Sequence, residues 1–100
     1  MRKFTFIADY KGGTYISQYL AENVIKARDL WAEGLSPKYF KKEERRIILK
    51  AVAKYRDDDA YLPILIRGID SVWHDFILVK EEALALNIVE TIEKPHEGEY

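Results

Sequence analysis

The sequence contains no cysteine, only three prolines and five glycines, and no long hydrophobic run. The missing cysteine excludes disulfides, thiolate zinc sites, iron–sulfur clusters and cysteine nucleophiles. No apolar stretch reaches the roughly 18 residues that a membrane-spanning helix needs, and the N-terminal segment MRKFTFIADY lacks the apolar core of a secretion signal. We therefore expect a cytoplasmic protein that does not enter a membrane.

The composition is that of an ordinary globular domain. Its 100 residues are 48% hydrophobic and 33% charged, which is too hydrophobic for a disordered chain and enough for one core. We expect a single α+β domain over residues 1–93. The last residues, 94–100, read as a flexible acidic tail.

Charge is unevenly distributed along the chain, although the formal net charge is only −1. Residues 36–56 carry +6, whereas residues 1–35 carry +1 and residues 57–100 carry −8. Such a basic segment can meet an acidic protein surface, a phosphate backbone, the acidic half of its own fold, or only water.

The N-terminal third predicts a β-hairpin followed by a helix. Residues 4–10 alternate aromatic and polar side chains, a Lys-Gly-Gly segment breaks the pattern, and residues 14–19 are β-branched and aromatic. The period then becomes helical from about Leu20 to Gly34, with Gly34 at the C-terminal cap position. We expect Trp31 to anchor the core.

A second helix carries the most distinctive surface pattern. Ser36 and Pro37 predict its start, and three successive aspartates at residues 57–59 predict its end. One arc of this helix is apolar. On the remaining face basic residues recur every four positions, and these are our candidate binding residues: Lys42, Arg46, Lys50 and Lys54.

The C-terminal part predicts three more strands, at residues 64–67, 72–79 and 83–92. The last segment also has helix propensity, and we favour a strand because its second half is β-branched. The predicted order is β-β-α-α-β-β-β, an α+β fold with a largely antiparallel sheet of about five strands and two helices packed on it.

Residues 72–79 place large apolar side chains on both faces of their strand. Val72, Phe76 and Leu78 point one way, and Trp73 points the other. Either the two helices divide between the faces of the sheet, or a second subunit covers the open face. We expect a homodimer.

No catalytic signature is present. His74 is the only histidine outside the tail, and the neighbouring Asp75 projects to the opposite face of the strand. A nucleophilic site would need Ser17, Ser36 or Ser71 to reach His74, and nothing in the sequence selects one of them. We therefore assign no catalytic residue, no cofactor and no metal ligand.

Three functions remain. We favour a small noncatalytic protein-interaction module that uses the basic helix. The alternative is an RNA-binding or RNA-directed protein in which Tyr39 and Tyr55 add aromatic surface to the same charges, although the chain as a whole is slightly acidic. A second alternative is a small hydrolase or ligand-binding enzyme around His74.

The N-terminal residues carry a family resemblance. The segment FTFIADYKGGTYISQ at residues 4–18, with Ala27 and Trp31 in the following helix, resembles a group of short bacterial proteins of no assigned function. More distantly, residues 4–34 are similar to the hairpin and helix of HicB-like antitoxins. That resemblance implies a small α/β protein that neutralises an RNA-degrading toxin. The chain lacks the antitoxins' third strand before the helix and their DNA-binding domain, so no site residue is carried over.

Overall fold

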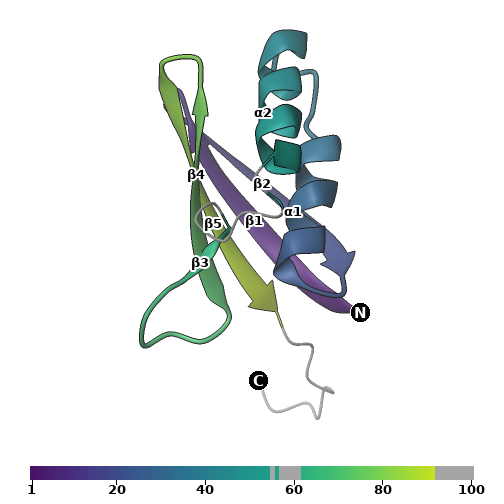
Figure 1. Cartoon of the computed structure of the whole chain (residues 1–100), viewed down its shortest axis with the longest axis vertical. Coiled ribbons are helices and arrows are strands. Elements are labelled where there is room, and N and C mark those ends of the chain that lie inside the picture. The colour runs from purple at the N-terminus through teal and green to yellow at the C-terminus, as the bar shows by residue number, and fades with distance from the viewer. Residues whose placement is uncertain (55, 57–61, 92–100) are drawn as a thin grey trace, which may run out of the picture.

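Two long hairpins and one short strand form a five-stranded antiparallel sheet, and two helices connect the first hairpin to the rest of the sheet (Figure 1). The computed structural model describes residues 1–54, 56 and 62–91. Its elements are β1 (Arg2–Tyr10), β2 (Gly13–Ala21), α1 (Val24–Glu33), α2 (Lys42–Lys54), β3 (Ile64–Leu65), β4 (Val72–Val79) and β5 (Glu82–Thr91). The strand order across the sheet is β2-β1-β5-β4-β3. The predicted fold class and element order are confirmed.

The first hairpin closes through a two-residue turn. Tyr10 pairs with Gly13, and the turn residues Lys11 and Gly12 have φ angles of 49° and 79°. Positive φ at both positions suits the right-handed twist of paired strands, and glycine adopts it without strain. All nine residues of β1 then pair in register with β2.

The second hairpin joins β4 to β5 through Lys80 and Glu81, and β5 then pairs with β1. This places the last described strand in the middle of the sheet. Residues 82–91 are therefore a strand, as we favoured, because they find hydrogen-bonding partners on both sides. The aspartates at residues 57–59 and the tail predicted over residues 94–100 lie outside the described residues.

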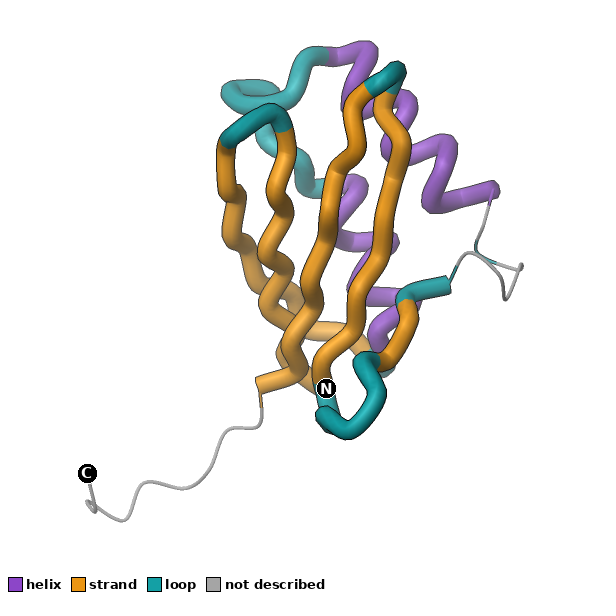
Figure 2. The backbone as a smooth tube through the Cα atoms, turned by 90° about the vertical axis from the view of Figure 1, so that its left-hand side faces the viewer, coloured by secondary structure: helices purple, strands orange, loops and turns teal. Residues whose placement is uncertain are grey.

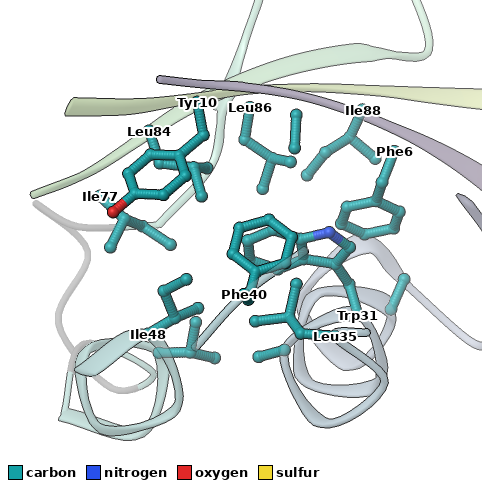
Figure 3. Packing of buried hydrophobic residues seen from close by; sticks show 14 of the residues in the cluster. Phe6, Tyr10, Trp31, Leu35, Phe40, Ile48, Ile77, Leu84, Leu86 and Ile88 are labelled. Atoms are coloured by element: carbon teal, nitrogen blue, oxygen red, sulfur yellow. The ribbon is translucent and has the colours of Figure 1, made fainter. Parts of the chain in front are cut away.

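Both helices pack on the same face of the sheet (Figure 2). Alternate residues of the strands point toward them, and Trp31 of α1 stacks on Phe6 of β1 with 5.8 Å between ring centroids and 6° between planes. Figure 3 shows this layer between the sheet and the helices. Trp31 is 2% exposed, so its predicted role in the core is confirmed.

The starts of both helices differ from prediction. β2 continues through Ala21, so α1 begins at Val24, with Asn23 as the residue that caps it. Ser36 and Pro37 form a separate turn, and α2 begins only at Lys42. There Glu44 accepts a hydrogen bond from the backbone N–H of Lys41 at 2.8 Å, which is one of the two hydrogen bonds of a capping box. The Ser-Pro pair had indicated an earlier start.

The other face of the sheet is left uncovered by any described element. It carries large exposed apolar side chains from three of the strands, namely Ile16, Leu20, Ile64, Phe76 and Leu78. We call this surface the open face. Of the two arrangements that residues 72–79 suggested, the helices therefore do not divide between the faces. Neither helix of the described chain is long and apolar enough to cross a membrane.

Candidate functional site

The candidate site is a groove along the outer side of the two helices, about 770 Å³ in volume, which we call the α1–α2 groove. Its walls are charged: α2 contributes Lys42, Arg45, Arg46 and Lys50, and α1 contributes Asp29 and Glu33. Its floor is apolar and consists of Ala32, Leu49, Val52 and Ala53. Arg56, just beyond α2, completes the lining.

Three of the four predicted basic residues, Lys42, Arg46 and Lys50, line this groove. Lys54 does not belong to the lining. The reason is geometric, since an α-helix has 3.6 residues per turn and each step of four residues turns a side chain by about 40°. Over three steps the row drifts by about 120° and leaves the groove wall.

Arg45 and Arg56 line the groove but were not predicted from the sequence. Arg45 lies three residues after Lys42 on the same side of the helix, a spacing that could have identified it. Arg56 could not be found in this way, because it reaches the groove by an ion pair with Asp29 of α1, with 3.1 Å between Nη2 and Oδ1. That contact exists only once the two helices are packed together.

The positive charge of the α2 wall is only partly balanced. Arg56 is paired with Asp29, and Arg45 donates from Nε to the carbonyl oxygen of Phe40 at 3.2 Å. The structure gives Lys42, Arg46 and Lys50 no ion pair with another described residue, and all three are exposed. The groove thus combines an apolar floor, one basic wall with unneutralised charge and one acidic wall.

Among the described residues, the polar contact of His74 is an asparagine and not a carboxylate or a serine. Nδ1 of His74 lies 2.9 Å from Oδ1 of Asn87, and the histidine ring packs edge-on against Phe76 on the open face. Asp75 points to the helix side, as predicted from strand alternation, where it pairs with Arg28 at 2.8 Å.

None of the three serines considered is joined to this histidine. Ser36 instead accepts a hydrogen bond from the backbone N–H of Lys38 at 3.2 Å, and Ser17 lies on the helix side of β2. Within the part of the chain that the structure describes, no group of three histidine or acidic side chains could hold a metal ion.

Comparison with known proteins adds no family assignment. No protein-family model matches the chain, and neither the curated proteins nor the solved structures contain a match.

Proposed function

We propose that this protein is a cytoplasmic, noncatalytic interaction module whose α1–α2 groove binds an acidic segment of a partner protein. One observation carries the proposal: Lys42, Arg46 and Lys50 stand without ionic partners among the described residues, beside an apolar floor. Unneutralised cations next to apolar surface can bind a partner through complementary charge and burial together.

The acidic wall of the groove favours a protein partner over nucleic acid. A phosphate backbone lying in the groove would bring negative charge toward Asp29 and Glu33 as well as toward the basic wall, whereas a helix can confine its acidic side chains to the side that faces the basic wall. No aromatic side chain is among the described residues that line the groove, and Tyr39 lines a hollow beside β2 instead. Tyr55 lies outside the described residues. An amphipathic helix with acidic and apolar sides meets both the basic wall and the apolar floor.

The alternatives rest on weaker support. An RNA-directed role would use the same three cations, and the experiment below separates it from protein binding. A hydrolase would need a nucleophile and a carboxylate beside His74, whereas the described polar contact of His74 is Asn87. The HicB-like resemblance would make the partner a toxin, and it stays a prediction.

We also propose that the module is a homodimer joined through the open face. On β1, β2, β4 and β5 this face carries only two formal charges, Lys3 and Asp9, whereas a water-facing side of an antiparallel sheet is normally polar. Its four long strands span about 30 by 19 Å, so two copies would bury about 1,100 Å², which exceeds the roughly 1,000 Å² that a specific interface needs.

Charge arrangement supports pairing of two copies rather than a foreign partner. Lys3 and Asp9 lie at opposite ends of β1, about 20 Å apart. A two-fold axis that crosses β1 near Phe6 reverses the strand direction in the second copy. Each Lys3 then lies over the Asp9 of the other copy, which complements both charges.

The groove is tested by capture from lysate with matched variants. The tagged wild-type chain, the groove variant K42Q/R46Q/K50Q and the control K26Q/K54Q/K80Q are compared with and without nuclease, and bound protein is measured by mass spectrometry. Both variants lose three positive charges, but the control residues lie outside the groove lining. Surface ion pairs such as those of Lys26 and Lys80 contribute little to folding.

We expect a stoichiometric protein that survives nuclease, is retained by the control and is lost from the groove variant. Titration of that purified protein should show about tenfold weaker binding to the groove variant and a smaller salt dependence. Nucleic acid that is lost with nuclease and with the groove variant would establish the RNA-directed alternative instead. Equal capture by both variants would contradict a role for the groove.

A further inference from the structure

The outer edge of β2 is a regular strand edge that lies apart from the α1–α2 groove. β2 is the terminal strand of the sheet, and its nine residues, GTYISQYLA, include no charge and no proline. Its pairing with β1 is uninterrupted, so no bulge turns the edge away. Long, regular, uncharged edges of this kind readily pair with another strand, and proteins usually blunt them.

Backbone groups along this edge lack partners in the sheet. Tyr10 and Gly13 close the two-residue turn, so hydrogen-bonded pairs recur at every second residue of β2 from Gly13 onward. The alternate residues, Thr14, Ile16, Gln18 and Leu20, direct their N–H and C=O groups away from β1. No described segment forms a backbone hydrogen bond with these four residues from outside.

A hollow of about 390 Å³ lies directly beside these groups. Five aromatic side chains contribute to its lining: Tyr15, Tyr19, Trp31, Tyr39 and Phe40. Thr14 and Ile16 also line it, although their side chains belong to the opposite side of the sheet. Thr14 and Ile16 therefore line the hollow with their backbone atoms. The outward N–H and C=O groups of the strand edge thus lie beside an aromatic cavity.

The end of the hollow near the first turn is positively charged. A smaller adjoining hollow shares three of its aromatic residues and adds Lys11, Lys38 and Lys41. Its one carboxylate, Glu44, is already engaged by the Tyr10 hydroxyl at 2.6 Å and by Lys11 at 3.2 Å. The three lysines thus leave a net positive charge that an incoming carboxylate would balance.

We propose that β2 accepts an extended peptide segment of a partner protein as a sixth strand, antiparallel to it. Backbone hydrogen bonds to the outward groups supply affinity, and an aromatic or aliphatic side chain in the hollow supplies specificity. In the antiparallel direction the C-terminal end of the peptide lies beside Thr14 and the lysines. The preferred ligand therefore carries an acidic residue, or its own terminal carboxylate, downstream of the apolar one.

The test is selection of a random nine-residue peptide library displayed on phage against the full wild-type chain. Ile16→Pro removes an outward N–H without breaking the β1–β2 ladder, and proline is tolerated at a sheet edge. Ile16→Thr changes the same side chain and keeps the N–H, so it is the matched control. K38Q/K41Q tests the acidic preference, and K42Q/R46Q/K50Q tests independence from the α1–α2 groove.

We expect enriched peptides with alternating apolar residues and a downstream acid. They should bind Ile16→Pro about tenfold more weakly and bind Ile16→Thr and the groove variant unchanged. In the wild type, the peptide should slow amide hydrogen exchange at Thr14, Ile16, Gln18 and Leu20, which tests the proposal even if Ile16→Pro folds poorly.

Absence of enrichment, or unchanged exchange at these four amides, would overturn strand addition. So would self-association of the wild-type chain that Ile16→Pro abolishes and Ile16→Thr retains. Both variants lose the Ile16 side chain from the open face, but only Ile16→Pro loses the outward N–H, so a second copy would then occupy the edge. Loss of peptide binding in the groove variant would assign the peptides to the groove instead.

Discussion

Arg28 of α1 and Asp75 of β4 form a buried ion pair 47 residues apart in the sequence, with 2.8 Å between Nη1 and Oδ2. Their side chains are 2% and 9% exposed, so the pair is shielded from water. It joins the first helix to the second hairpin and holds α1 on the helix-covered face of the sheet.

Removing one member of this pair should destabilise the protein strongly. Asp75→Ala removes the buried carboxylate that pairs with the Arg28 guanidinium, and we expect the free energy of unfolding to fall by about 3–5 kcal/mol. Urea denaturation of the wild type, Asp75→Ala, Arg28→Met and the double variant measures the coupling. Additive losses in the double variant would show that the pair contributes no coupling of its own.

Glu44 should make stability depend on acidity. The hydrogen bonds that Glu44 accepts from the Tyr10 hydroxyl and from the Lys41 N–H lower the pKa of Glu44 from 4.5 to about 2. Burial raises the pKa of Tyr10, and the hydrogen bond to Glu44 raises it further. The charged form of Glu44 therefore favours the folded state, and this contribution is present above pH 4.5 and lost as the pH falls toward 2.

When the pH falls from 5 to 2, the free energy of unfolding should therefore decrease in both proteins, but by about 1–3 kcal/mol less in Glu44→Gln than in the wild type. Denaturant titration at several pH values measures the difference. Tyr10→Phe is the companion variant, because it removes the largest cause of the low pKa and should shift the acid transition to higher pH. Parallel pH profiles of all three proteins would contradict the assignment.

Gly34 is required by packing rather than by its backbone conformation. Its φ of −93° is open to any residue, but an added Cβ would lie 2.9 Å from the Tyr19 hydroxyl and 3.2 Å from the Leu30 carbonyl oxygen. Gly34→Ala should therefore cost about 1 kcal/mol instead of giving the usual gain. In a Tyr19→Phe background we expect most of this cost to disappear, as thermal denaturation would show. An equal cost in both backgrounds would place the clash at Leu30 instead.

The open face should control oligomeric state. Phe76 and Leu78 are 62% and 69% exposed on it, and lysine at both positions would place four charges in the interface of two copies. Light scattering after size exclusion should find the wild type dimeric and F76K/L78K monomeric. Leu30→Lys, a similar change on the exposed side of α1, should remain dimeric. A monomeric wild type would refute the homodimer, and a dimeric F76K/L78K would refute this interface.

Much of the fold was predictable because short-range signals decide it. The alternation around Gly12 predicts the first hairpin, and β-branched residues outweigh the helix propensity of residues 82–91 once partners are available. The spacing of Lys42, Arg46 and Lys50 places them together on one helix face, so most of the candidate site was also predictable. These features depend only on residues within a few positions of one another.

The rest depended on contacts between distant segments. The sequence does not indicate that Arg28 faces inward, since its burial depends on Asp75 arriving from β4. It also does not reveal that Arg56 meets Asp29, or that a hollow forms beside β2 where the α1–α2 connection crosses it. Local periodicity and turn chemistry specify which segments are strands and helices and where the basic surface lies, so these features follow from the sequence. That both helices cover one face and leave the other open depends on how all the apolar surfaces pack together, and it becomes visible only in the folded chain.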